Sequence, residues 1–343
     1  MGARVCRAVG RVEGVAVIGV SRGARGPLGV AMERGDVRDA GSIGRLLGAG
    51  DLVVNCVGPF HYDPGPIVRA CVAAGAHYCD LADDVKFVEG VRAAAREAGA
   101  LLAGGCVCSG ASTVPGLVGV FARALARAPR ADEITHVAAY LSVGSANPVS
   151  AGLLVSLLAP LGRPAAGGAR WFEELRALRT SDGRTLRFGS YPAAFSQGRV
   201  PAGAVPALAR FYFGFDRAAL VALLHLAAPL LARIADTALP RFAQALLPFA
   251  RAAGVFGTPR GVLAVVGETA AGEEIARIEL SATARGLDIP AAPPAWIAAQ
   301  LAQGGALPAG ARELSELVPF TDVVRWVRAD AAYALTERGF GIA

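Results

Sequence analysis

Short, continuous apolar runs separated by helical segments fill the first third of this chain. Runs at 15–20 and 52–57 are apolar on consecutive residues, and a third at 77–81 follows a predicted helix over 65–74. A strand that is apolar on both faces must be buried on both faces, which predicts a parallel sheet flanked by helices. Because one helix separates successive strands, the expected fold class is α/β, with a doubly wound parallel sheet. Further helices are predicted over 40–49 and 85–98, and a further strand over 100–103.

The pattern changes after about residue 130. Strands are predicted over 134–142 and 261–268, with helix-rich sequence over 204–253 between them. Residues 275–281 alternate apolar and polar side chains, which predicts an antiparallel strand with one face in solvent. These elements indicate a second domain of the α+β class.

Length sets the number of domains. The chain has 343 residues, and at roughly 150 residues per domain two domains are expected. We place the first domain at 1–128 and the second at 129–309, and we expect a helical tail, 310–343, to pack back on the first.

The beginning of the chain departs from the expected pattern. A nucleotide-binding, Rossmann-like domain opens with a strand and a G-x-G-x-x-G loop that leads into a helix. Residues 1–9 already have the pattern of that helix, and Gly2 fits the last glycine of the loop. The first strand and most of the glycine loop are therefore missing, and we expect the sequence to start downstream of the true start. Their loss would leave two strand edges unpaired.

The end of the run at 15–20 bears on the choice of cofactor. An acidic residue there binds the ribose hydroxyls of NAD, whereas arginine suits the extra phosphate of NADP. This chain has Ser21 and Arg22, with no acid before Glu33. We therefore favour NADP over NAD, the alternative being that Arg22 is an ordinary solvated side chain.

The end of the run at 52–57 faces the crevice in which such sheets bind cofactors. Gly58 permits close approach of a ribose or nicotinamide, although a Gly-Pro pair is also an ordinary turn. The cofactor-binding candidates here are Asn55, Cys56, Val57, Gly58, Pro59 and Phe60.

Acid–base candidates follow the run at 77–81. We expect His77 and Asp83 to lie together at one strand end, where either side chain could move a proton. The alternative, which we favour, is that Asp80 and Asp83 cap the helix that begins near Asp84.

Ser112 and Thr113 precede Pro115, a pattern typical of a helix N-cap. The same two side chains could instead bind an anionic substrate. An amino-dicarboxylate substrate would require basic residues in the second domain, where Arg163, Arg170, Arg176 and Arg179 are available.

Composition excludes several classes of protein. With 54% hydrophobic and 18% charged residues, the chain is neither disordered nor fibrous. It carries a net charge of +6, yet Lys86 is its only lysine, which we attribute to coding bias rather than to an anionic partner. The cysteines form no C-x-x-C pair and the four histidines give no zinc spacing, so we expect no metal site. Charged residues interrupt the first 13 positions, so we expect no signal segment there. We expect a reduced, cytoplasmic protein that binds no nucleic acid.

One leucine-rich segment, 218–232, is uncharged but shorter than the roughly 20 residues that a membrane span requires. We favour a buried or dimer-facing helix, which fits an expected homodimer. The alternative is a helix that lies on a membrane or lipid surface, with Arg217, Arg233 and Arg241 around it.

Several stretches resemble the saccharopine dehydrogenase-like proteins. Residues 51–84 contain VNCVGPF, ACVAAG and HYCDLADD, and residues 110–117 read GASTVPGL. Looser similarity continues in IPAAPPA at 289–295 and in Gly310-Ala311. The family's glycine loop can be carried over only onto Gly2.

The resemblance implies a Rossmann domain that binds NADP(H) and a second domain for substrate and dimer contacts. It implies an NAD(P)-dependent oxidoreductase that transfers hydride to a small-molecule substrate, which the sequence does not identify. The alternatives are a non-catalytic or lipid-surface-associated relative and an inactive, truncated product.

Overall fold

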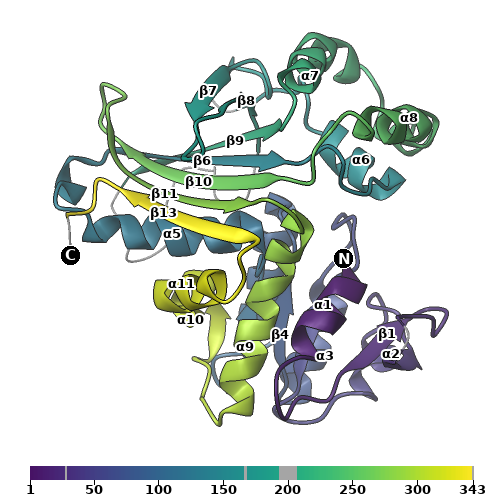
Figure 1. The fold of residues 1–343 in the computed structure, drawn as a ribbon. Coiled ribbons are helices and arrows are strands. Elements are labelled where there is room, and N and C mark those ends of the chain that lie inside the picture. The colour runs from purple at the N-terminus through teal and green to yellow at the C-terminus, as the bar shows by residue number, and fades with distance from the viewer. Residues whose placement is uncertain (28, 166–167, 193–206, 342–343) are drawn as a thin grey trace. The chain divides into compact units, whose positions relative to one another are not determined.

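The computed structural model describes residues 1–27, 29–165, 168–192 and 207–341 (Figure 1). The chain divides into two compact units. Unit 1 comprises Met1–Val120 and Asp288–Asp322, and unit 2 comprises Phe121–Leu287 and Val323–Ala343.

Unit 1 is built on parallel strands. Its strands are β1 Ile18–Ser21, β2 Ala31–Arg34, β3 Leu52–Asn55, β4 His77–Asp80, β5 Cys106–Cys108 and β12 Gly310–Arg312. One sheet has the order β12-β5-β4-β3, and a separate two-stranded sheet pairs β1 with β2. Every pairing in both sheets is parallel. The helices are α1 Gly2–Val9, α2 Ala40–Gly44, α3 Gly65–Ala73, α4 Val85–Glu97, α9 Ala292–Ala302 and α10 Leu314–Leu317.

Strands β1 and β3 of unit 1 each have one edge without a partner among the described strands. Among the described strands, β1 pairs only with β2 and β3 pairs only with β4, as the sequence predicts. Helix α1 connects the two sheets through side-chain packing: Val5 and Val9 share a buried cluster with Val17, which leads into β1, and with Val54 of β3. Ala298 of α9 belongs to the same cluster, so α1 and α9 pack on the same side of β3.

One predicted strand of this unit is wrong. Residues 100–103 form a turn, and the strand begins later, at Cys106. Gly99 and Gly104 both have positive φ, at 69° and 75°, so the backbone reverses between them instead of extending. An apolar run alone does not reveal such a reversal.

Unit 2 contains a mixed seven-stranded sheet. Its strands are β6 His136–Val143, β7 Leu175–Arg179, β8 Thr185–Ser190, β9 Leu208–Phe215, β10 Gly261–Glu268, β11 Glu274–Ala282 and β13 Tyr333–Arg338. The order is β13-β11-β10-β6-β9-β8-β7, with only the β6–β9 pair parallel among the described strands. The helices include α6 Ala151–Leu158, α7 Ala218–Leu231 and α8 Leu239–Gly254, which lie beside one end of this sheet (Figure 1). Helices α5 Val118–Ala124 and α11 Phe320–Arg328 contain the points where the chain passes from one unit to the other.

The structure corrects three further expectations. Residues 208–215 form strand β9, although the surrounding segment was expected to be helical, and the tail contributes strands β12 and β13 as well as helices. Strand β11 is buried on both faces, although its alternation predicts a wet face. Its polar face is covered because Arg277 donates to the Arg179 carbonyl at 2.7 Å, and Ser181 donates to Glu279 Oε1.

The fold class is confirmed as α/β with parallel strands and helices in unit 1, together with a second α+β unit. All six cysteines are free, and Cys71, Cys79, Cys106 and Cys108 are buried, as their apolar context predicts. In the described part of the chain, no helix combines the length and apolar character needed to cross a membrane.

Candidate functional site

The carboxyl ends of β3 and β4 bring two polar side chains together. Asn55 ends β3, Asp80 ends β4, and the two residues are direct partners in the parallel register. Both are buried, with Asn55 2% and Asp80 0% exposed. Because ligands of open parallel sheets bind outside the carboxyl ends of the strands, this edge is the candidate site.

Asn55 is the centre of a hydrogen-bond network. Its Nδ2 lies 2.9 Å from the Tyr62 hydroxyl and 3.0 Å from the Tyr78 hydroxyl, and its Oδ1 accepts the Val57 N–H at 3.1 Å. Burial raises the pKa of Tyr62 to about 12, despite the opposing hydrogen bond from Asn55. Burial likewise raises the pKa of Tyr78 well above its ordinary value. Both phenols are therefore neutral near pH 7 and fix the strand end by hydrogen bonding.

Asp80 fixes the next loop. Its Oδ1 accepts the N–H groups of Ala82 at 2.9 Å and Gly110 at 2.8 Å, and its Oδ2 accepts the Ser109 hydroxyl at 2.8 Å. Burial raises the pKa of Asp80, and these donors act in the opposite direction. The carboxyl group therefore ties the end of β4 to the segment that follows β5.

That segment is tightly packed around a glycine. Gly110 has a φ of +75°, and a Cβ at this position would lie 2.6 Å from the ring of Pro115 and 3.2 Å from the Ala82 carbonyl. Ser112 and Thr113 follow and are buried. Ser112 precedes the helical turn Thr113–Leu117 but makes no side-chain cap; its hydroxyl donates to the Val114 carbonyl at 2.9 Å.

The structure brings Gly2 and Cys56 together. A Cβ on Gly2 would lie 3.8 Å from Cys56 Cβ, so α1 begins beside the carboxyl end of β3. Burial raises the pKa of Cys56 to about 12, while the amino group of Met1 acts to lower it. The thiol is therefore un-ionised near neutral pH, and the positive end of α1 faces this edge.

The predicted turn after Cys56 is open to solvent. Val57, Gly58 and Pro59 are exposed, and the Phe60 ring packs against Phe87 with centroids 4.9 Å apart. A Cβ on Gly58 would meet the Phe60 ring only at 3.9 Å. The chain's own packing therefore leaves room above Gly58, as it does above Gly2, and both positions fit a sugar or phosphate group lying on bare backbone.

Ser21 and Arg22 stand at the end of β1. The Ser21 hydroxyl accepts the Arg25 N–H at 3.1 Å, which closes the turn after the strand. Arg22 is exposed and forms no ion pair with any residue that the structure describes. Its guanidinium is thus available to an anion.

The expected cluster of His77 with Asp83 does not form. His77 is the first residue of β4 and lies at the opposite end of that strand from Asp80. Its Nδ1 accepts the Cys106 N–H at 3.1 Å, and burial lowers its pKa. Asp83 is exposed beyond the carboxyl end, and the cap of α4 is Asp84, which accepts the Phe87 N–H at 2.8 Å. The expectation was wrong because the short strand β4 lies between the two residues: His77 begins it and Asp83 follows its end.

Sequence reasoning missed Tyr62 and Ser109, and it did not predict the hydrogen bond between Asn55 and Tyr78. Tyr62 lies in a loop, so it follows no periodic pattern. The signal that could have indicated such partners was Asn55 within an apolar run, because a buried amide requires hydrogen-bonding partners.

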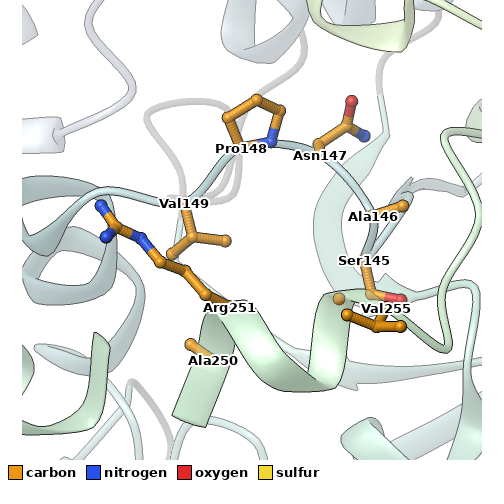
Figure 2. Close-up of a pocket in the computed structure, with 9 residues that line it drawn as sticks. Ser145, Ala146, Asn147, Pro148, Val149, Ala250, Arg251 and Val255 are labelled. Atoms are coloured by element: carbon orange, nitrogen blue, oxygen red, sulfur yellow. The ribbon is translucent and has the colours of Figure 1, made fainter. Parts of the chain in front are cut away.

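Unit 2 contains a separate hollow of about 460 Å³ (Figure 2). Among the described residues that line it, Arg251 is the only charged one, so an anionic group suits it. Arg163 and Arg176, which the sequence offered for such a role, are instead paired with Asp236 and Glu268. The hollow is lined by Ser145, Ala146, Asn147, Pro148, Val149, Ala250, Arg251, Gly254 and Val255.

Asp216 holds the loops around this hollow. Its Oδ1 accepts the N–H and hydroxyl of Ser145 at 2.8 and 2.6 Å, and its Oδ2 accepts those of Thr258 at 2.7 and 2.8 Å. Burial acts to raise the pKa of Asp216, but these hydrogen bonds outweigh it and hold the pKa below its ordinary value of 3.8.

We expect Asp216→Asn to lower the free energy of unfolding by about 2–3 kcal/mol at neutral pH, because an amide nitrogen would face two donors. Since the pKa of Asp216 is lowered on folding, its contribution is present above the unfolded pKa of 3.8 and is lost as pH falls through the folded value. Urea unfolding of both proteins between about pH 3 and 7 measures this difference. Exposed Asp132→Asn is the matched control, and a variant difference that stays constant below pH 3.8 would contradict the assignment.

Comparison with known proteins finds a match within the first unit. Residues 25–103 match the family model for the saccharopine dehydrogenase NADP binding domain. The probable mitochondrial saccharopine dehydrogenase-like oxidoreductase of Arabidopsis thaliana is 34% identical over 98 residues, which cover 27% of this chain and 21% of the relative. The match therefore spans about a fifth of that relative's length.

The overall fold has a solved counterpart. Apo histidine-tagged saccharopine dehydrogenase (L-Glu forming) from Saccharomyces cerevisiae matches with a TM-score of 0.58 and 13% identity. The alignment covers 98% of this chain and 97% of the yeast chain, so the two share a fold. Residues 25–103 are thus similar to the saccharopine dehydrogenase NADP binding domain, and the chain as a whole shares the fold of the yeast enzyme.

Proposed function

We propose that unit 1 binds NADP(H) at the carboxyl ends of its strands and that the protein is an NADP-dependent oxidoreductase acting on a small molecule. The observation that carries this proposal is the match of residues 25–103 to an NADP binding domain. It is supported by the open backbone at Gly2 and Gly58 beside the start of α1. The expected cytoplasmic location stays a prediction, and the Arabidopsis relative is named as mitochondrial.

Different residues at this edge bind different parts of the cofactor. The start of α1 at Gly2 faces a phosphate, and Arg22 takes the 2′-phosphate that distinguishes NADP from NAD. The turn from Cys56 to Phe60 covers the ribose and nicotinamide, with Asn55 holding that turn through the Val57 N–H. When bound, NADPH supplies the hydride; the chain positions cofactor and substrate.

The candidates for substrate binding and proton transfer are Ser112, Thr113 and Asp83. Ser112 and Thr113 lie after β5, near the Asp80-bound loop, and we keep them as candidates for an anionic substrate. Asp83 is the remaining acid–base candidate on this edge because its side chain is exposed there, whereas His77 lies at the other end of β4.

Titration of the protein with NADPH and with NADH, followed by nucleotide fluorescence, tests the proposal. We expect saturable binding of NADPH and weaker binding of NADH. Absence of binding for both nucleotides would contradict the oxidoreductase assignment and would favour a non-catalytic or inactive protein.

We expect Arg22→Ala to weaken NADPH binding by roughly tenfold or more while leaving NADH binding unchanged, because only NADPH has the 2′-phosphate. Parallel fluorescence titrations with the two nucleotides measure the effect. Arg96→Ala removes an exposed arginine from the last turn of α4 and is the matched control for net charge. Equal losses for NADPH and NADH would show that Arg22 does not read the 2′-phosphate.

A further inference from the structure

Helix α7 presents an apolar stripe to solvent. Leu223, Leu226 and Leu230 are 61%, 74% and 65% exposed, and their spacing places them on one side of the helix. The opposite side is buried through Val221, Ala228 and Leu231. Of the favoured expectation of a buried or dimer-facing helix, burial is therefore seen on one side only.

Helix α8 and the residues after it repeat this arrangement. Phe242, Phe249 and Phe256 recur every seven residues and are 37%, 72% and 76% exposed, and Val255 beside them is 80% exposed. Phe242 and Phe249, both within α8, therefore lie on the same side of the helix, and Val255 and Phe256 follow directly after its end. Exposed aromatic side chains in such a row are unusual for a surface that meets only water.

The inner sides of these helices are firmly packed. Buried residues of α6, α7 and α8 share one hydrophobic cluster with Leu161 and Phe172. The exposed stripes are therefore not part of this core, and substitutions in them leave the packing of unit 2 intact. The core residues of this cluster are Leu154, Leu158, Leu161, Phe172, Val221, Ala228, Leu231, Leu239, Ala243 and Leu247.

The charges around the stripes are almost all positive. Residues 217–260 contain a single acidic residue, Asp236, and its carboxylate pairs with Arg163 at 2.5 Å. Figure 2 shows one of the basic residues, Arg251, on α8, where it lines the same hollow as Val255. The arginines of this segment are Arg217, Arg233, Arg241, Arg251 and Arg260.

We propose that the outer faces of α7 and α8 dock on the surface of an anionic phospholipid membrane. The leucine and phenylalanine side chains enter the boundary between headgroups and acyl chains, and the arginines contact lipid phosphates. A second copy of this chain fits the surface poorly, because pairing two such faces would oppose arginines without acids between them. The helices lie on the membrane and do not cross it, in keeping with their length.

Vesicle flotation tests the proposal with the full chain. Vesicles of phosphatidylcholine alone are compared with vesicles that also contain phosphatidylglycerol, at low and high salt. We expect binding to the anionic vesicles, with roughly tenfold or greater loss for Leu226→Glu and for Phe249→Glu. Arg233→Gln and Arg241→Gln should each weaken binding by about fivefold, on anionic vesicles only.

Leu102→Glu is the matched control, because Leu102 is 93% exposed in unit 1, outside the two stripes. It should bind like the unchanged protein, and circular dichroism should show that every variant is folded. The proposal is overturned if the unchanged protein floats with neither vesicle, or if the two glutamate variants float as it does. It is also overturned if the unchanged protein does not bind vesicles but light scattering shows that it forms a dimer, which Phe249→Glu dissociates. The face would then bind a second copy of the chain.

Discussion

Asp80→Ala is expected to lower the free energy of unfolding by about 3–5 kcal/mol, one of the two largest effects that we predict for this chain. The carboxyl group accepts hydrogen bonds from Ala82, Ser109 and Gly110, and its side chain is fully buried. Alanine would leave these donors without partners and without access to water. Urea unfolding, followed by circular dichroism and tryptophan fluorescence, measures the loss.

Asp80→Asn separates the hydrogen bonds from the side-chain volume. The amide oxygen can still accept from Ala82 and Gly110, and the Ser109 hydroxyl can rotate to accept from the amide nitrogen. We therefore expect a loss of only about 1 kcal/mol. If alanine and asparagine cost the same, the three donors do not depend on Asp80 as the geometry indicates.

Gly110→Ala is expected to cost about 4 kcal/mol or more. The new Cβ would lie 2.6 Å from the ring of Pro115, which cannot move aside as a flexible side chain would. The positive φ of +75° adds backbone strain. The same urea unfolding experiment measures both contributions together.

Gly104→Ala provides the matched control for that strain. Gly104 has the same φ of +75°, but a Cβ there would have no neighbour within 4 Å. Its substitution should cost only about 1–2 kcal/mol. A similar loss at both glycines would show that the Pro115 contact relaxes at little cost and that only the backbone matters.

The sequence predicted those elements whose signal is local. The strand at 261–268 agrees with β10 at both ends, because its continuous apolar run is buried on both faces. The strand at 275–281 was placed correctly, but its wet face is buried, because Arg277 and Glu279 meet partners about a hundred residues earlier in the chain. Periodicity within a strand cannot report which distant loop will cover it.

The candidate site shows the same division. Asn55 at a strand end follows from the apolar run before it, whereas its bonds to Tyr62 and Tyr78 depend on where a loop and a neighbouring strand come to lie. The sequence offered Gly2 and Cys56 as separate cofactor-binding candidates, and the structure adds that they lie beside each other. His77 was misplaced because a motif that spans a short strand has residues at both of its ends.

The packing of α1 sets a distance that a dinucleotide would have to match. In a continuous sheet, backbone hydrogen bonds fix the spacing between the strand that carries the adenosine end and the strand that carries the nicotinamide end. Here β1 and β3 belong to separate sheets, and an eight-residue helix fastens them through Val5 and Val9. The distance between Arg22 and Gly58 is therefore set by the packing of a few methyl groups. Helix α1 thus determines how far apart the two halves of the proposed cofactor site lie.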